Sequence, residues 1–278
     1  MRRFLTLTLA LMLSVAFVAS GCSSSKKSDT ATTGTTVGST AAPVAGTITV
    51  SAAASLTGAF GTIKDDFVKA NPGANITINF GSSGTLESQI ESGAPADVAA
   101  FADEATMKKL SDKNLLAAPA EIFATNQLII VTKPGNPKGI KTLADLSTAG
   151  TIALCADTAP CGKYANQVLT TASVTIPTSS VSLGQDAKTT LAAVADGDAV
   201  AGIVYATDAK ASTKVDTVEI PTAQNVVAKY PIAVLKATTS NELANAFMEY
   251  VLGPEGLAVL KAAGFQAPWS RSRSSRCR

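Results

Sequence analysis

The chain turns from a strand into a helix within Ile48-Thr49-Val50-Ser51-Ala52-Ala53-Ala54-Ser55-Leu56. The β-branched residues at its start favour a strand, and Ser55 is a preferred N-cap residue for a helix. Phe60 and Ile63 follow at helical spacing, and Asn71-Pro72-Gly73 is expected to end the helix. The first N–H groups of a helix have no partner within it and lie at the positive end of its dipole. This junction can therefore hold an anion without a charged side chain.

A junction of the same kind recurs at three further places, each after an expected strand. They are Gly81-Ser82-Ser83-Gly84-Thr85 before a short helix, Asp157–Gly162 before the helix Lys163–Leu169, and Ser182–Asp186 before the helix Ala187–Ala195. Glycines let a ligand approach the backbone closely, and serines add hydroxyl donors. One such junction alone predicts only a helix cap. The repetition favours a binding site.

Strands and helices alternate along the body of the chain, which predicts an α/β fold with mostly parallel sheets. The expected elements include strands at 75–80, 127–131, 151–155, 199–205 and 226–235, and closing helices at 241–252 and 255–263. In such sheets, ligands bind at the carboxyl ends of strands. The residues at or just past those ends are Ser55, Ser83, Cys161, Ala187 and Tyr205. They come from both halves of the chain, so a cleft between two lobes would bring them together.

Length and composition limit the classes of function. The chain has 278 residues, 46% of them hydrophobic, which is enough for two compact domains. It contains no histidine, which excludes Ser-His and Cys-His catalysis and histidine metal sites. The 23 basic residues slightly outnumber the 21 acidic ones, but six arginines lie at the two ends of the chain. The body is therefore acidic, which argues against nucleic acid as a partner.

Residues 1–22 predict a lipoprotein signal peptide, because two arginines precede an apolar run and Ala19-Ser20-Gly21-Cys22 resembles a lipobox. Cys22 would then carry the lipid. A plain signal peptide or a membrane anchor is the alternative, although the apolar run is short for a membrane span. Residues 23–46 predict a flexible Ser/Thr/Gly-rich tether, and residues 269–278 predict a disordered basic tail. We expect an exported protein, lipid-anchored to the outer face of the cell membrane.

Two cysteines of the body lie close together in the sequence. Cys155 ends an expected strand and Cys161 begins the next helix, with five residues between them. In an exported protein this spacing favours a structural disulfide. The alternative is a thiol enzyme, because a cysteine at a helix N-terminus can have a lowered pKa. The chain has no histidine to serve as its base, and a count of free thiols would separate the two hypotheses.

Five motifs together resemble one known family, the extracytoplasmic molybdate-binding proteins of ABC transporters. The resemblance covers roughly residues 47–268, with the motifs in the family's order. The motifs are Ala52-Ala53-Ala54-Ser55-Leu56, Gly81-Ser82-Ser83-Gly84-Thr85-Leu86, Ser92-Gly93-Ala94-Pro95-Ala96-Asp97, Gly202-Ile203-Val204-Tyr205 and Tyr230-Pro231-Ile232-Ala233-Val234.

The resemblance implies a site that holds a tetrahedral oxyanion by backbone N–H groups, two serine hydroxyls and one tyrosine hydroxyl. Carried over by motif, the binding residues are Ser55, Ser83, Cys161, Ala187 and Tyr205. The family commonly has a small apolar residue at the position of Cys161, and a third serine is frequent at the position of Gly84. Neither difference removes a backbone donor.

The resemblance also implies a type II periplasmic-binding-protein fold with a hinged cleft. One lobe would comprise residues 46–123 and 230–268, and the other residues 124–229, with hinge crossings near 124–127 and 228–231. The chain would be a monomeric receptor without enzymatic activity or cofactor. It would bind molybdate and tungstate and deliver them to an ABC permease. The metal would be bound only as its oxyanion, with no direct ligation by protein.

Other ligands remain as alternatives. Sulfate or phosphate are also oxyanions, but a site for protonated phosphate needs a buried carboxylate acceptor, and Asp186 is expected to be occupied as a helix cap. An iron site would need clustered tyrosines and acids, whereas Tyr205 is the single tyrosine at these junctions. A surface adhesin would not need several donor-rich junctions that converge on one cleft.

Overall fold

A computed structural model describes residues 43–268. The expected signal peptide (1–22), the lipidation site Cys22, nearly all of the tether (23–46) and the basic tail (269–278) lie outside the described residues. Within residues 43–268, no helix has the length and apolar character that a membrane span requires.

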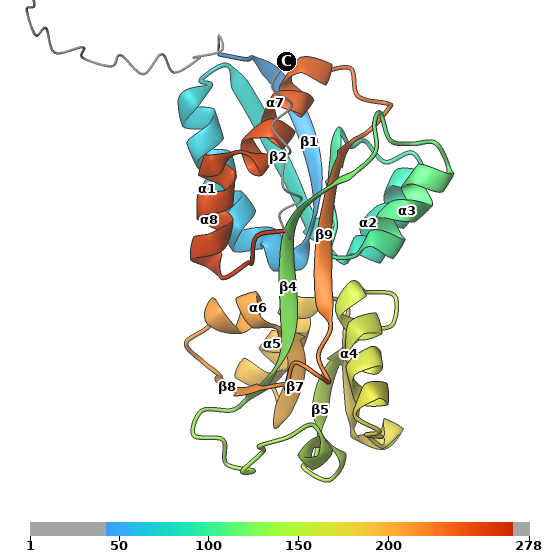
Figure 1. Cartoon of the computed structure of the whole chain (residues 1–278), viewed down its shortest axis with the longest axis vertical. Helices are drawn as coiled ribbons and strands as arrows, with labels where there is room; N and C mark the ends of the chain where they lie inside the picture. The colour runs from blue at the N-terminus through green and yellow to red at the C-terminus, as the bar shows by residue number, and fades with distance from the viewer. Residues whose placement is uncertain (1–42, 269–278) are drawn as a thin grey trace, which may run out of the picture. The chain divides into compact units, whose positions relative to one another are not determined.

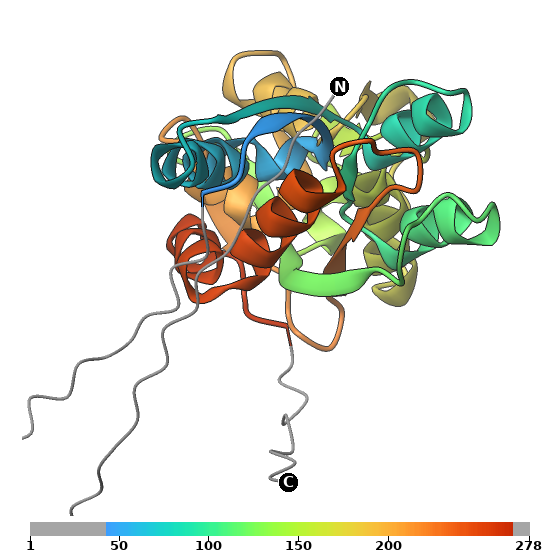
Figure 2. The same ribbon diagram turned by 90° about the horizontal axis from the view of Figure 1, so that it is seen from above.

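The first half of the sheet is built from the N-terminal elements. They are β1 (Gly46–Ala53), α1 (Thr57–Ala70), β2 (Ala74–Gly81), α2 (Ser83–Glu91), β3 (Val98–Ala100) and α3 (Glu104–Asp112). β1 pairs in parallel with both β2 and β3. The C-terminal helices α7 (Asn241–Leu252) and α8 (Pro254–Ala263) return to this half. Figures 1 and 2 both show α1 and α8 on one side of these strands and α2 and α3 on the other.

The apolar face of α1 explains why the C-terminal helices pack there. Phe60, Ile63 and Phe67 recur at helical spacing and are all buried. Phe247 of α7 meets Phe60 and Phe67 edge to face, with ring centroids 6.3 and 5.5 Å apart. Burial of these rings stabilises the packing of α7 against α1.

The second half of the sheet is built from the middle of the chain. Its elements are β5 (Ile152–Cys155), α4 (Pro160–Thr171), β6 (Val181–Gly184), α5 (Ala187–Ala195), β7 (Ala201–Tyr205), α6 (Ala206–Lys210) and β8 (Asp216–Glu219), with short 3-10 turns at Ala144–Ser147 and Thr178–Ser180. β5 pairs in parallel with β6 and β7. The helix starts of α4 and α5 therefore lie beyond the carboxyl ends of neighbouring strands.

Two long strands join the halves. β4 (Glu121–Thr132) and β9 (Val227–Val234) run side by side in opposite directions, with Gln127 opposite Val227 (Figure 1). β3 pairs with β9, and β7 and β8 pair with β4, all antiparallel. The strand order is β2-β1-β3-β9-β4-β7-β5-β6, with β8 beside β4.

The expectation of mostly parallel sheets is therefore wrong, because the sheet is mixed. The α/β class is correct, and each half contains parallel pairs joined through helices. The antiparallel pairs arise because β4 leaves the first half and β9 returns to it, so the two connecting strands run in opposite directions. Alternation of strands and helices along a sequence does not reveal such a return.

Candidate functional site

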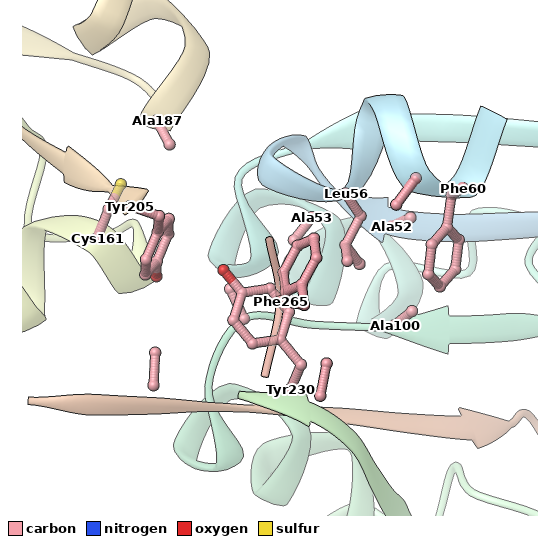
Figure 3. Packing of buried hydrophobic residues seen from close by; sticks show 14 of the residues in the cluster. Ala52, Ala53, Leu56, Phe60, Ala100, Cys161, Ala187, Tyr205, Tyr230 and Phe265 are labelled. Carbon is pink, nitrogen blue, oxygen red and sulfur yellow. The ribbon is translucent and has the colours of Figure 1, made fainter. Parts of the chain in front are cut away.

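The five residues expected at strand ends line one small cavity. The cavity has a volume of about 10 Å³, close to the volume that one water-sized sphere occupies. Its walls come from both halves of the sheet: Ala53, Ala54, Ser55, Gly81, Ser82, Ser83 and Ala102 from the first, and Ala159, Pro160, Cys161, Asp186, Ala187 and Tyr205 from the second. Figure 3 shows Cys161, Ala187 and Tyr205 on one side of the site and Ala53 on the other. The structure thus brings together all five.

Three helices begin at this cavity. α2 has Ser82 at its N-cap, α4 has Pro160 at its first position, and α5 has Asp186 at its N-cap. Their first N–H groups have no acceptor within the helix and carry the positive end of the helix dipole. None of the lining residues is a lysine or an arginine. The positive potential at the cavity therefore comes from backbone rather than from charged side chains.

Asp186 is occupied by its own helix, as expected. Its carboxylate accepts a hydrogen bond from the backbone N–H of Thr189 (2.8 Å), and the Thr189 hydroxyl accepts one from the Asp186 N–H (3.1 Å). This capping box engages Oδ1 of the carboxylate and directs the Asp186 side chain toward its own helix.

Ser55 does not cap a helix, contrary to the expectation. It lies in a 3-10 turn, Ala54–Leu56, and Leu56 is the N-cap residue of α1. The Ser55 hydroxyl is instead 3.0 Å from the hydroxyl of Tyr230 on β9. Tyr230 is fully buried, and its hydroxyl also accepts a hydrogen bond from the Asn126 amide of β4 (3.4 Å). The connecting strands therefore position the first predicted binding residue.

Ser83 is the first residue of α2. Its hydroxyl oxygen accepts a hydrogen bond from the backbone N–H of Ala102 (3.0 Å), just beyond β3. A hydroxyl that accepts this bond keeps its own proton free to donate. The bond ties two segments of the first half together at the cavity wall.

Two hydroxyl groups at the cavity are buried without a hydrogen-bond partner among residues 43–268. They belong to Ser82 and Tyr205. An unpaired buried hydroxyl costs about 1–3 kcal/mol, so such groups mark sites where a ligand or water supplies the partner. Burial also raises the pKa of Tyr205 well above its usual value, which keeps the hydroxyl protonated and able to donate.

The sequence interpretation missed Ser82 as a site residue. The signal was present in Gly81-Ser82-Ser83, where two adjacent serines follow a strand. Ser83 was chosen from the family motif, and nothing in the sequence decides which of two neighbouring serine side chains lacks an internal partner.

The predicted disulfide joins Cys155 and Cys161, whose Cα atoms are 5.7 Å apart. It closes the loop between β5 and α4 beside the cavity. The bonded sulfur of Cys161 is not a thiolate, so the alternative of a thiol enzyme is contradicted. Within the described residues, no group of three or more potential metal-ligating side chains is found.

Comparisons with known proteins agree with this geometry. Residues 48–266 match the family model "Bacterial extracellular solute-binding protein". The molybdate-binding protein ModA of Mycobacterium tuberculosis is 39% identical over 223 residues, which cover 80% of this chain and 85% of the relative. The putative ABC transporter substrate-binding lipoprotein YvgL of Bacillus subtilis is 32% identical, covering 80% of this chain and 86% of the relative.

Two solved structures share the fold at low sequence identity. The periplasmic molybdate-binding protein of Azotobacter vinelandii has a TM-score of 0.73 at 24% identity, covering 80% of this chain and 99% of that chain. The sulfate-binding protein SubI of Mycobacterium tuberculosis has a TM-score of 0.72 at 18% identity, covering 80% of this chain and 86% of that chain. Taken with the family model and the sequence relatives, these findings show that the chain is a bacterial extracellular solute-binding protein of the molybdate-binding protein ModA family.

Proposed function

We propose that this protein captures molybdate between two lobes and delivers it to an ABC permease, and that it also accepts tungstate. The observation that carries the proposal is the pair of buried, unpartnered hydroxyls of Ser82 and Tyr205 at a cavity where three helices begin. A tetrahedral oxyanion would accept hydrogen bonds from these hydroxyls and from the helix N–H groups.

The chemistry of the cavity favours a fully ionised oxyanion. Its ligand-facing groups are neutral donors, and the carboxylate of Asp186 is bound within its own helix. A protonated phosphate would leave its hydroxyl without an acceptor, which costs about 1–3 kcal/mol. Sulfate carries the same charge as molybdate but is smaller, so it would leave some donors unmatched. The match between the donors and the oxygens of the anion, rather than charge, therefore selects the anion.

The fold alone does not distinguish a molybdate site from a sulfate site. The solved molybdate-binding and sulfate-binding proteins match this chain with nearly equal TM-scores of 0.73 and 0.72. The choice of molybdate rests on the sequence relative at 39% identity, whose name is molybdate-binding protein.

Binding is coupled to closure of two lobes, residues 46–123 with 230–268 and residues 124–229. The hinge lies near 124–127 and 228–231, where β4 and β9 are hydrogen-bonded neighbours. Asn126, on β4, also donates a hydrogen bond to the Tyr230 hydroxyl of β9 (3.4 Å). Both crossings therefore move as one paired ribbon, and closure removes water from the anion.

The protein is exported and held at the outer face of the membrane by a lipid on Cys22. The family is extracellular, and the relative YvgL is named as a lipoprotein. Residues 1–22 are the signal peptide and residues 23–46 the tether, which lets a monomeric body reach the permease.

A retention experiment tests the proposed ligand. The purified chain is equilibrated with molybdate, separated from free anion by gel filtration and analysed for molybdenum. We expect about one molybdenum atom per wild-type chain and strongly reduced retention by the Ser82→Ala/Tyr205→Phe double variant. No retention by the folded wild-type chain would contradict the proposal.

A further inference from the structure

Gly84 meets the second half of the sheet at the edge of the cavity. It lies in the first turn of α2, and a Cβ atom placed on it would overlap the carbonyl oxygen of Thr158. Thr158 belongs to the loop between β5 and α4 that the Cys155–Cys161 disulfide closes. The obstacle is backbone rather than the end of a flexible side chain, so it cannot move aside by a change of rotamer.

The contact separates the cavity from an outer groove. On one side, Ser83 and Ala159 line the cavity. On the other, Gly84 and Thr158 line a groove of about 670 Å³. In each of the two segments, one residue lines the cavity and its neighbour in the sequence lines the groove. The Gly84–Thr158 contact therefore lies between the two. It forms a lip that closes the cavity on this side.

A second contact joins the same two halves of the sheet. The ammonium group of Lys163 on α4 lies 3.5 Å from the carboxylate of Asp103 and 3.4 Å from the hydroxyl of Thr106, both at the start of α3. Lys163 also lines the groove. Two independent contacts thus bring the loop and helix of the second half against helices of the first half at this face.

We infer that Gly84 determines how tightly the bound anion is enclosed, because in this chain the Thr158 carbonyl occupies the space that a side chain at position 84 would need when the loop closes over the cavity. This inference deepens the proposed function and rests on it. With the halves apart, a methyl group at position 84 meets no obstacle. With the halves together, it forces the loop outward and leaves the anion open to the groove. The substitution therefore penalises the closed, ligand-bound form alone.

The test compares Gly84→Ala and Gly84→Ser with Gly61→Ala in the full chain. Gly61 is a matched control because it is also helical, on α1, and a Cβ atom there meets nothing within 4 Å. Overpacking typically costs 1–3 kcal/mol, so both Gly84 variants should bind molybdate about 5- to 150-fold more weakly than wild type. The loss should lie in faster release, measured by chasing radiolabelled molybdate with unlabelled anion.

The melting temperature of the unliganded protein separates enclosure from folding. Replacing a helical glycine by alanine restricts the unfolded chain. The melting temperature of the unliganded protein should therefore not fall in Gly84→Ala or in Gly61→Ala. The penalty should also shrink in a Cys155→Ser/Cys161→Ser background, where the loop can yield. Unchanged release from Gly84→Ala, or a lowered melting temperature of the unliganded variant, would overturn the inference. If wild type itself retains no molybdate, the proposed function fails instead.

Discussion

The hydroxyl of Ser55 lies 3.0 Å from the hydroxyl of Tyr230, which links the turn after β1 to the strand β9 that joins the two halves of the sheet. The Tyr230 ring is fully buried and packs edge to face on Tyr205, with centroids 5.8 Å apart. Tyr230 does not line the cavity, but it contacts two residues that do, Ser55 and Tyr205. Tyr230 is a positioning residue for the site.

Tyr230→Phe should weaken molybdate binding, because Ser55 loses the partner that orients its hydroxyl. A hydrogen bond of this kind contributes about 0.5–1.5 kcal/mol, so the expected loss is up to about tenfold. Calorimetric titration measures it. Tyr250→Phe is the control, since Tyr250 packs on Phe67 of α1 and does not line the cavity. Equal affinity of Tyr230→Phe and wild type would show that Ser55 needs no support from β9.

Ser82→Ala and Tyr205→Phe should lower affinity without lowering stability. Each hydroxyl lacks an internal hydrogen-bond partner within the described part of the chain, so its removal breaks no bond of the folded protein. A hydrogen bond to a charged group is worth about 1.5–3 kcal/mol, which is the expected loss of binding free energy. Urea unfolding without ligand provides the comparison, with a change at an exposed serine, Ser179→Ala, as a surface control. Wild-type affinity in either variant would remove that residue from the site.

Replacement of both bridging cysteines, Cys155→Ser/Cys161→Ser, should weaken binding while most of the fold remains. The closed loop is short, and the chain-entropy relation gives about 2 kcal/mol of lost stability. The unpinned loop must then be ordered when the anion binds, which reduces affinity further. Circular dichroism and calorimetry measure the two effects. Mass measurement after thiol labelling checks the bond, and free labelling of both cysteines in the native protein would contradict it.

Loss of the Asp208 proton should lower the free energy of unfolding as pH rises. The side chain is buried on α6, and its pKa is raised to about 7. Burial is the main cause and the charge of Asp186 adds to it, while a backbone hydrogen bond at Tyr205 and the charge of Lys188 act in the opposite direction. In the folded protein the group therefore keeps a proton up to about pH 7, but in the unfolded chain only up to about pH 4. Between these values the folded state binds more protons, so stability is lost with rising pH.

Asp208→Asn mimics the protonated group and should lack this dependence. The stability of Asp208→Asn relative to wild type should increase between about pH 4 and pH 7 and then stay constant. Urea unfolding of both proteins across this range measures the difference, in which the other titrating groups cancel. A difference that does not change with pH would show that the carboxyl is not protonated in the folded protein.

Sequence patterns located the helices well because their apolar spacing and end signals are local. The closing helix was expected at 241–252 and is found at Asn241–Leu252, whereas the helix expected at 163–169 is longer in the structure, Pro160–Thr171. The expected strand at 127–131 is longer in the structure, Glu121–Thr132, because its first residues pair with β9. The short elements β8 and α6 were missed, since four or five residues carry too little periodicity to stand out.

The site was predictable in outline for a related reason. Its residues follow strands, and strand ends are readable from sequence, so the five expected residues meet in one cavity. The partners of their hydroxyls were not predictable, because they depend on contacts between distant segments. Tyr230 is 175 residues from Ser55, and Ala102 is 19 residues from Ser83. The capping role given to Ser55 was wrong because this long-range partner competes with the local one.

Calorimetric titration of the purified chain with molybdate, tungstate, sulfate and phosphate tests the central claim most directly. We predict that molybdate and tungstate both bind, at about one anion per chain. Sulfate should bind at least about tenfold more weakly, because each donor that it leaves unmatched costs about 1–3 kcal/mol. Phosphate should be weaker still. Sulfate binding as tight as molybdate binding, or no molybdate binding by folded protein, would contradict the account.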